Sequence, residues 1–273
     1  MVAASRSAAE HLDDAADDIS VTAGWSPGRH PATQRSVPSA SMLDEELLAI
    51  LRRCMLFERM DDAPLRALLP SFRRRQFRRG EVVFHEGDPG ASLHVLTIGE
   101  AKVSLTSAQG EEVIVRTLIP GDPFGEIALL DQAQRSATVT ALQRSESLEL
   151  QRPAFLALLD DPAFRSALLA SVAGELRRLT RLVEELRFLD VAGRVEAIIL
   201  RGAEGRAATP EGEVSVPWHH TQADLAAMAG TTRQSVNRVL ADLADRGVIR
   251  MEPDVLVVRD VARLARDARL ASL

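Results

Sequence analysis

The hydrophobic spacing of this chain changes part-way along, and that change limits its fold more than any other feature. Between residues 79 and 150, short apolar runs alternate with glycine-bearing turns such as Glu86-Gly87-Asp88 and Pro120-Gly121-Asp122. Strands of this length, at a spacing of about 8–12 residues, predict an antiparallel sandwich or roll. On both sides of this region the apolar residues follow helical spacing. The pattern therefore predicts an α+β protein with a β-roll between helical segments.

The β-roll and the segment before it can be divided further. We expect strands at residues 82–84, 93–98, 103–105, 113–118, 137–142 and 147–150. Helical spacing begins at about Leu43, and a second short helix is expected at residues 64–69. Residues 1–42 are rich in Ala, Ser, Asp and Pro. Such a segment buries too little apolar surface to offset its ordering entropy, so we expect a disordered tail.

A long helix with one narrow apolar stripe is expected at residues 161–189. The stripe consists of Leu168, Val172, Leu176, Leu179, Val183 and Leu186. Intervals of three and four residues are typical of a coiled-coil seam. The opposite face carries charged residues, namely Glu175, Arg177, Arg178, Arg181, Glu184 and Glu185. We therefore expect a homodimer through this helix; the alternative is that the stripe packs on the β-domain of its own chain.

The region after Asp190 predicts a helix-turn-helix. A helix at 191–200 is followed by Thr221 and Asp224, which form a capping box with Asp in place of Glu, and by Gly230, which supplies the turn. Thr231 or Thr232 begins the second helix. Its exposed start carries the side chains expected to contact DNA, namely Thr232, Arg233, Gln234, Asn237 and Arg238. Arg, Gln and Asn suit bidentate contacts with base edges in the major groove, whereas an ordinary amphipathic helix pair needs no such cluster. Residues 248–258 are expected to form a β-hairpin wing.

A second motif runs from Phe124 to Val139 and has the chemistry of a phosphate site. Gly125 allows close approach of the backbone to a ligand, and residues 127–129 predict a short helical turn whose N–H groups attract phosphate. Glu126 can accept a hydrogen bond from a ribose hydroxyl. Arg135 offers a fixed charge with a planar set of donors, and Ser136 adds a hydroxyl. Together these groups match a cyclic phosphate fused to a ribose; the alternative is a salt bridge between Glu126 and Arg135.

The string from Phe124 to Val139 resembles the phosphate-binding cassette of cyclic-nucleotide-binding domains. With the long helix, the string 188–194 and the winged helix-turn-helix, the chain resembles the CRP/FNR family of bacterial regulators from about Leu43 onward. The resemblance implies a homodimer with a cyclic nucleotide, cAMP in the leading interpretation and cGMP or none as alternatives, in each β-roll. The implied ligand residues are Gly125, Glu126, Ile127, Ala128, Arg135, Ser136, Ala137 and, on the long helix, Thr180. Leu179 stands where the cAMP-responsive branch has a second hydroxyl.

The resemblance also implies how DNA is read. Arg233 and Arg238 fall where the family contacts guanines, and Gln234 replaces the more usual glutamate. The implied partners are double-stranded DNA with a near-palindromic operator, a second copy of the chain and RNA polymerase. The expected domains are a tail (1–42), a cyclic-nucleotide-binding β-roll (43–160), a dimerisation helix (161–189) and a winged helix-turn-helix domain (190–273).

The resulting hypothesis is a transcription regulator controlled by cAMP. One alternative is a regulator of the same fold that is constitutive or senses another ligand. The other is a cyclic-nucleotide-binding regulatory protein that acts on a protein partner. The sequence contains no G-x-S-x-G, Walker or H-E-x-x-H motif, so we expect no enzyme activity, no catalytic residue and no metal.

Composition excludes several further classes. The net charge of −6 excludes a generally polybasic protein that binds nucleic acid or membranes through its overall charge. The single cysteine, Cys54, cannot hold a disulfide within the chain, a cysteine-built zinc site or an iron–sulfur cluster. His85 and His94 are expected in strands as ordinary core or surface residues rather than haem ligands, and His219-His220 as polar residues at a helix entry. Apolar stretches fall short of the ~18 residues of a membrane span, and no secretory signal is present, so we expect a cytoplasmic protein.

Overall fold

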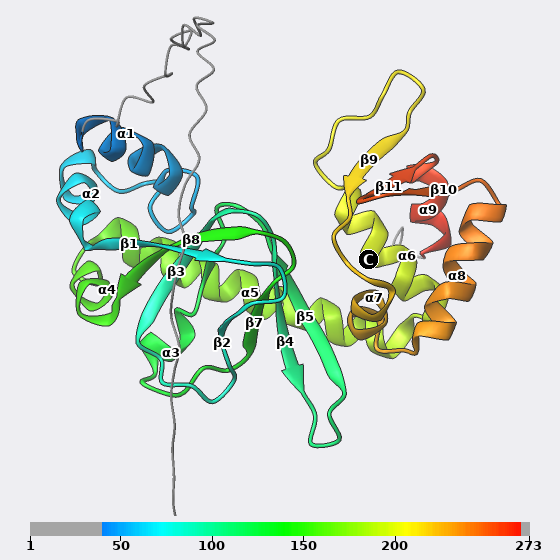
Figure 1. The fold of residues 1–273 in the computed structure, drawn as a ribbon, viewed down its shortest axis with the longest axis horizontal. Helices are drawn as coiled ribbons and strands as arrows, with labels where there is room; N and C mark the ends of the chain where they lie inside the picture. Colours follow the sequence, from blue (N-terminus) through cyan, green and yellow to red (C-terminus); the bar gives the residue numbers. More distant parts are fainter. Residues whose placement is uncertain (1–39, 269–273) are drawn as a thin grey trace, which may run out of the picture. The chain divides into compact units, whose positions relative to one another are not determined.

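The computed structural model describes residues 40–268 (Figure 1). The expected tail therefore lies outside the described residues except at its end, where helix α1 (Ala40–Leu51) begins three residues before the expected start at Leu43. Helix α2 (Asp62–Leu68) and the 3-10 turn η1 (Leu69–Ser71) follow and match the second predicted helix.

Two four-stranded antiparallel sheets form the β-roll among the described residues. One sheet has the order β1-β8-β3-β6, and the other β2-β7-β4-β5. The strands are β1 (Phe72–Phe77), β2 (Val82–Phe84), β3 (Ser92–Ile98), β4 (Ala101–Thr106), β5 (Glu112–Leu118), β6 (Pro123–Phe124), β7 (Thr138–Ala141) and β8 (Ser145–Gln151). Each predicted strand is present within a few residues, but His85 lies just after β2 and not in a strand.

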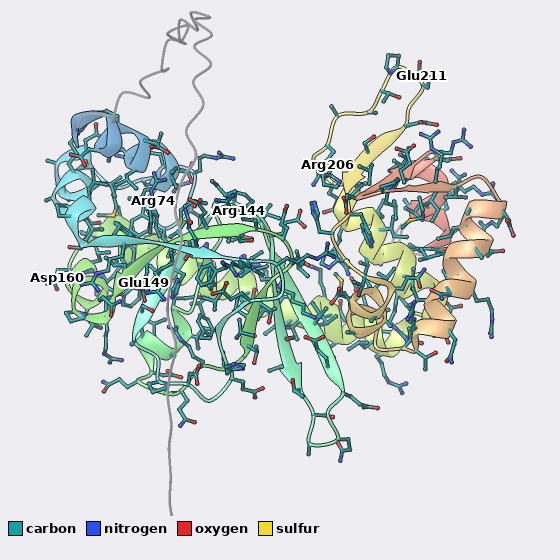
Figure 2. All side chains as sticks on the ribbon, in the orientation of Figure 1. Arg74, Arg144, Glu149, Asp160, Arg206 and Glu211 are labelled. Atoms are coloured by element: carbon teal, nitrogen blue, oxygen red, sulfur yellow. The ribbon has the colours of Figure 1, made fainter. Side chains whose placement is uncertain are left out.

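Strand β1 was missed by the sequence analysis because its middle is Arg73-Arg74-Arg75-Gln76, which shows no apolar alternation. These side chains are exposed, and Arg74 among them is labelled in Figure 2. The guanidinium of Arg74 pairs with the carboxylate of Glu46 at 3.1 Å. The ladder with β8, from Phe72 opposite Leu150 to Phe77 opposite Ser145, holds the strand in the sheet. Hydrogen bonding to a neighbour, and not hydrophobic pattern, makes this segment a strand.

Strands β3 and β8 have two buried faces. On one face, Leu93 and Leu148 join a core that also contains Phe57, Phe155 and Phe164 from the helical segments. On the other face, Leu96 joins residues of the second sheet, among them Leu118 and Val139. The ligand cassette lies at the second of these interfaces.

Helix α4 (Arg152–Leu158) leads to the long helix α5 (Pro162–Phe188), whose N-cap Asp161 accepts a hydrogen bond from the backbone of Phe164. The predicted apolar stripe needs one correction. Leu168 is buried in the core of its own β-domain, whereas Leu169, which the prediction omitted, is 71% exposed. The solvent-facing stripe is therefore Leu169, Val172, Leu176, Leu179, Val183 and Leu186. Its intervals of three, four, three, four and three residues fit the heptad more closely than the predicted set.

Several of the charged residues of α5 are not fully exposed to solvent. Glu185 is 9% exposed and pairs with Arg201 at 2.5 Å. Glu175 and Arg178 are half-buried and pair with each other against the β-domain. Contacts with residues far away in the sequence, which the heptad pattern does not report, turn these side chains inward.

The C-terminal region is a winged helix-turn-helix. Its elements are α6 (Val191–Ala203), β9 (Val214–Pro217), α7 (Gln222–Ala229), α8 (Arg233–Asp245), β10 (Ile249–Glu252), β11 (Val255–Val258) and α9 (Val261–Asp267). Asp190 caps α6 by accepting a hydrogen bond from the backbone of Gly193. The predicted wing is β10 and β11, and β9 adds a third strand beside β11 that the sequence analysis did not identify. Four residues that end in proline carry too weak a pattern to identify a strand.

Candidate ligand pocket and DNA-binding helix

The cassette begins at a backbone turn that only glycine accommodates. Gly125 has φ +84°, and a Cβ atom there would lie 2.4 Å from Nη1 of Arg135. The short helix α3 (Ile127–Leu130) follows, as predicted. The turn thus leaves room for the Arg135 side chain against the backbone.

Arg135 is 5% exposed, and its contacts with the protein fix its position. Nη1 donates to the carbonyl of Gly125 at 2.7 Å, and Nη2 donates to the hydroxyl of Ser92 at 3.2 Å. The guanidinium carbon lies 4.1 Å from the centre of the Phe84 ring, a cation–π distance. Among the described residues, Nε of Arg135 is buried and has no hydrogen-bond partner. A buried donor without a partner costs roughly 1–3 kcal/mol, which an anionic ligand would recover.

Glu126 faces the same cavity and is 7% exposed. Burial raises the pKa of its carboxyl above the usual value, and the charges of Arg116 and Arg135 act in the opposite direction. The described residues contain no salt bridge between Glu126 and Arg135, which was the alternative interpretation of the motif. Both side chains therefore face the cavity without neutralising each other directly.

The cavity has a volume of about 70 Å³. Its lining includes these predicted ligand residues: Gly125, Glu126, Ile127, Ala128, Arg135, Ser136 and Ala137. Thr180 is not among the lining residues, since it lies exposed on α5 with its hydroxyl donating to the carbonyl of Leu176. Pockets that enclose small ligands usually measure about 300–1,000 Å³, so this cavity has to widen before a nucleotide enters.

The cavity lining also includes two charged residues that the sequence analysis did not identify as ligand residues, Arg116 and Glu175. Arg116 of β5 pairs with Asp122 at 3.0 Å and lies 3.7 Å from Glu175. Arg178 donates to Glu175 from Nε at 2.9 Å and to the carbonyl of Val115. Burial opposes ionisation of Glu175, but the hydrogen bonds and charge of Arg178 hold its pKa below the usual value. No local motif reveals such a cluster, because β5 and α5 are far apart in the sequence.

The helix-turn-helix has the predicted caps. Thr221 accepts a hydrogen bond from the backbone of Asp224, whose carboxylate accepts one in return from the backbone of Thr221. Gly230 ends α7 in the left-handed conformation at φ 58°, and Thr232 caps α8 by accepting from the backbone of Ser235. On α8 the side chains of Val236, Leu240 and Leu243 are buried. The predicted DNA-contacting residues Thr232, Arg233, Gln234, Asn237 and Arg238 are all exposed.

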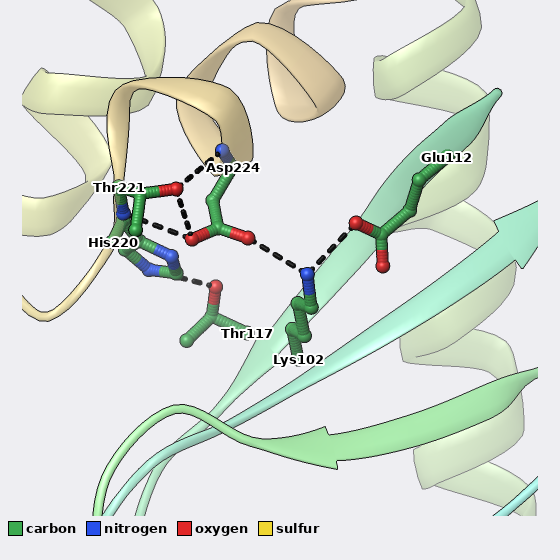
Figure 3. A network of polar contacts seen from close by, with 6 residues as sticks. All are labelled: Lys102, Glu112, Thr117, His220, Thr221 and Asp224. Atoms are coloured by element: carbon green, nitrogen blue, oxygen red, sulfur yellow. Dashed lines mark hydrogen bonds and ion pairs between the residues drawn. The ribbon is translucent and has the colours of Figure 1, made fainter. Parts of the chain in front are cut away.

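A polar network joins the first helix of this pair to the β4–β5 hairpin (Figure 3). Lys102 of β4 donates to Glu112 at 2.8 Å and to Asp224 at 2.7 Å. Asp224 uses one carboxylate oxygen for Lys102 and the other for the capping contacts with Thr221. Despite partial burial, these carboxylates raise the pKa of Lys102. A single cation thus connects the hairpin with the cap of α7.

The two adjacent histidines, expected as polar residues at a helix entry, lie just before α7 and also contact the β-domain. Nδ1 of His219 lies 3.0 Å from the carboxylate of Glu100, and Nε2 of His220 lies 3.2 Å from the hydroxyl of Thr117. Thr117 is the cross-strand partner of Lys102, and the next pair, Val103 and Arg116, lines the ligand cavity. Two neighbouring cross-strand pairs of this hairpin therefore have different contacts. One pair lines the ligand cavity, and the other contacts the helix-turn-helix.

Two family models match the chain. A cyclic nucleotide-binding domain matches residues 74–161, and a Crp-like helix-turn-helix domain matches residues 193–267. The chain is 33% identical over 221 residues to a CRP-like cAMP-activated global transcriptional regulator of Mycobacterium tuberculosis, a match that covers 81% of this chain and 99% of that protein. The chain belongs to the CRP/FNR family of transcription regulators. Members of this family are not enzymes, and this regulator combines a cyclic-nucleotide-binding domain with a DNA-binding one.

Further relatives agree with this CRP/FNR assignment. The cyclic AMP receptor protein of Thermus thermophilus is 35% identical over 197 residues, which cover 72% of this chain and 88% of that one. A solved CRP/FNR-family regulator from the same organism has a TM-score of 0.60 at 26% identity, over 72% of this chain and 98% of that one. FixK2 from Bradyrhizobium japonicum has a TM-score of 0.65 at 21% identity, over 72% and 96%, and shows the shared fold.

Within residues 40–268, no group of three or more His, Cys, Asp or Glu side chains is arranged to hold a metal ion. No helix of the same residues is long and apolar enough to cross a membrane. In the strand core, both ring nitrogens of His94 contact serine hydroxyls, so that histidine has no free nitrogen for a haem iron.

Proposed function

We propose that this CRP/FNR regulator binds cAMP in its β-roll and, as a homodimer, changes its affinity for a near-palindromic DNA site in response. The observation that carries the proposal is the Arg135 guanidinium, buried with an unpartnered Nε in a cavity that also contains the Glu126 carboxylate. A cyclic phosphate fused to a ribose supplies an anion for the first group and a hydroxyl donor for the second.

The ligand residues follow from this chemistry. The cyclic phosphate contacts Arg135, Ser136 and the backbone at Gly125, and the ribose contacts Glu126. Ile127, Ala128 and Ala137 shape the same wall. Names of relatives that describe cAMP activation favour cAMP over cGMP. Thr180, which is exposed on α5, is assigned to the adenine in the assembled dimer.

The proposed dimer uses the exposed stripe of α5. Leu176 and Val183 are 66% and 65% exposed, an unfavourable state that pairing of two helices removes. A glutamate at position 176 would face its own symmetry mate, so Leu176→Glu should convert a dimer to a monomer. Arg177→Glu, an exposed position one residue away, is the matched control and should remain dimeric. Sedimentation of a monomeric wild-type protein, with and without nucleotide, would exclude the dimer.

The DNA interface is assigned to the start of α8. Arg233 and Arg238 can each donate to O6 and N7 of a guanine, and Asn237 and Gln234 can pair with adenine or other base edges. Thr232 caps the helix and lies at its exposed end, where a hydroxyl can contact a phosphate. We assign RNA polymerase as the partner of the DNA-bound protein on the basis of the family.

Two measurements on the full chain test the proposal. Calorimetry with cAMP and with cGMP should give saturable binding with cAMP tighter. A DNA selection followed by mobility shift, with and without nucleotide, should yield a near-palindromic site that is bound more tightly with cAMP. Nucleotide-independent DNA binding would favour the constitutive alternative. Nucleotide binding without any selected DNA would favour a regulator that acts on a protein partner.

A further inference from the structure

A chain of buried polar side chains begins at Nη2 of the Arg135 guanidinium. Nη2 of Arg135 donates to Oγ of Ser92 at 3.2 Å. Oγ of Ser92 lies 3.1 Å from Nε2 of His94, and Nδ1 of His94 lies 3.1 Å from Oγ of Ser147. Ser92, His94 and Ser147 are 4%, 5% and 0% exposed. The chain therefore runs from the ligand cavity into the interior of the β-roll without reaching solvent.

The hydrogen bonds in this chain can be given one consistent direction. Because Ser92 accepts an N–H from Arg135, its single hydroxyl proton is available for Nε2 of His94. His94 then carries its proton on Nδ1 and donates to Ser147. Burial, together with the charge of Arg135, lowers the pKa of His94 to about 3, so the ring stays neutral and keeps Nε2 as an acceptor.

Aromatic packing fixes the same groups from the side. The His94 ring is stacked on Phe124, with centroids 5.1 Å apart, and Phe84 lies against both His94 and the Arg135 guanidinium. The His94 ring cannot turn without disrupting this stack. Its nitrogens are therefore held in line with the two serines.

The fold alone does not require these residues. Ser92 and His94 lie on the face of β3 that also carries Leu96, which packs against the second sheet. Apolar residues at positions 92 and 94 would fill the space without the cost of desolvating a serine and a histidine. What the polar residues provide is an oxygen that holds one side of a buried guanidinium.

We propose that Ser92 and His94 are positioning residues for the phosphate of the bound nucleotide. This inference rests on the proposed function. Ser92 holds Nη2 and the Gly125 carbonyl holds Nη1, which leaves Nε without a hydrogen-bond partner among the described residues. His94 acts through Ser92 by accepting a hydrogen bond from its hydroxyl group. The lone pairs of the serine oxygen then remain available to accept from Arg135. The guanidinium is ordered before the ligand arrives, and binding does not have to supply that ordering.

The test compares Ser92→Ala and His94→Phe with Ser145→Ala. Phe keeps the stack on Phe124 but cannot accept from Ser92. Ser145 is a matched control, because it is also buried and its hydroxyl donates to backbone carbonyls outside the polar chain. Calorimetry of the full-length proteins should measure Kd for cAMP and for the Sp and Rp phosphorothioate analogues, in which sulfur replaces one or the other exocyclic oxygen. Thermal unfolding should be followed in parallel.

A loss of positioning has a signature that a loss of stability lacks. Ser92→Ala should weaken cAMP binding roughly ten-fold, since one hydrogen bond to a charged group is lost. The ratio of the Sp and Rp dissociation constants should move toward one, because a loosely held guanidinium no longer prefers one oxygen. His94→Phe should change both quantities in the same direction, and Ser145→Ala should change neither.

The outcomes separate the two levels of the proposal. Wild-type protein that binds neither cAMP nor cGMP would overturn the proposed function and, with it, this inference. Wild-type binding with unchanged Kd and Sp/Rp ratio in Ser92→Ala would overturn the positioning role alone. Equal losses in Ser92→Ala and Ser145→Ala would also overturn it, since general loosening would then explain both. If His94→Phe fails to fold, Ser92→Ala decides, because it removes a single oxygen atom.

Discussion

The arginine of the ligand cassette and the arginines of α8 differ in how far the protein has already ordered them. Arg135 is buried and contacts a carbonyl, a hydroxyl and an aromatic ring. Arg233 and Arg238 are exposed, and within residues 40–268 the one side-chain hydrogen bond of Arg233 is a long contact of 3.3 Å with Gln222. Folding therefore already includes the entropy cost of ordering Arg135, whereas in the proposed DNA complex Arg233 and Arg238 are ordered only on binding. Rigid recognition of one small anion and adjustable recognition of a long duplex call for these two arrangements.

The largest effect should come from removing the preordered arginine. Arg135→Ala should abolish nucleotide binding, a loss of more than about 100-fold, because no other cation on the cassette replaces its charge. Circular dichroism should show a folded protein, and Arg144→Ala, an exposed arginine of the same domain (Figure 2), should bind as the wild type does. Unchanged calorimetric affinity in Arg135→Ala would show that the cassette is not the ligand site.

Removing one exposed arginine of α8 should have a smaller effect that is confined to one base. Arg233→Ala or Arg238→Ala should each cost roughly 1–3 kcal/mol, mainly at one guanine of each half-site. Selected binding sites for wild type and variant, compared at matched salt, measure this, and the other base positions serve as the internal control. A uniform loss at every position would instead identify a phosphate contact.

The buried carboxyl of Glu196 tests whether burial raises a carboxyl pKa in the DNA-binding domain as it does for Glu126 in the cassette. Burial, with the nearby charge of Asp267, raises the pKa of Glu196 from 4.5 to about 7. The native state then binds the proton more tightly than the unfolded state, so stability is highest below pH 4.5 and falls as the pH rises through about 7. Glu196→Gln should remove this loss, on the order of 2 kcal/mol at pH 8 after allowance for solvent screening.

Urea unfolding of wild type and Glu196→Gln at pH 5 and pH 8 provides the measurement. The difference between the two proteins isolates Glu196, because Glu126, whose pKa is also raised by burial, is present in both. An equal fall in stability in both proteins would assign the pH dependence to another group.

The smallest effect should be the change at Gln234, which alters the kind of base read without altering overall affinity. Glutamine can accept and donate, as adenine requires, whereas glutamate can only accept, as from N4 of cytosine. Gln234→Glu should therefore shift one half-site position toward cytosine on the contacted strand. Identical motifs selected by the two proteins would mean that Gln234 reads no base.

The parts of this molecule that could be predicted from the sequence are those whose signals are local. Gly125 and the turn at residues 127–129 follow from their own backbone requirements, and Thr221, Asp224 and Gly230 mark caps within a few residues. The strands appear because glycine-bearing turns separate them. In each case the residues that decide the structure are neighbours in the chain.

The remainder depended on partners distant in the sequence. Leu168 and Leu169 both fit a helical stripe, and only the core around Phe164 decides which of them is buried. His94 was recognised as a core or surface residue, but its alignment with Ser92 and Ser147 arises from the pairing of β3 with β8. Glu175 was placed only by its position on the helix, because its neighbour Arg116 belongs to another element. Hydrophobic periodicity indicates which face of a helix or strand is buried, but it does not identify the residues that this face contacts.

The β4–β5 hairpin limits how far this protein can be divided into exchangeable modules. A chimera joined at Asp190 would keep the nucleotide-binding domain with Lys102. Its DNA-binding domain would come from another protein, so Asp224 would be replaced by whatever residue that protein has there. Unless the imported helix carries a carboxylate at the same place, Lys102 keeps only Glu112 as its anionic partner. Because Lys102 is the neighbour along β4 of the cavity residue Val103, that change is made one residue from the ligand site. Engineered sensors built from this protein should therefore be cut so that the hairpin and α7 come from the same parent.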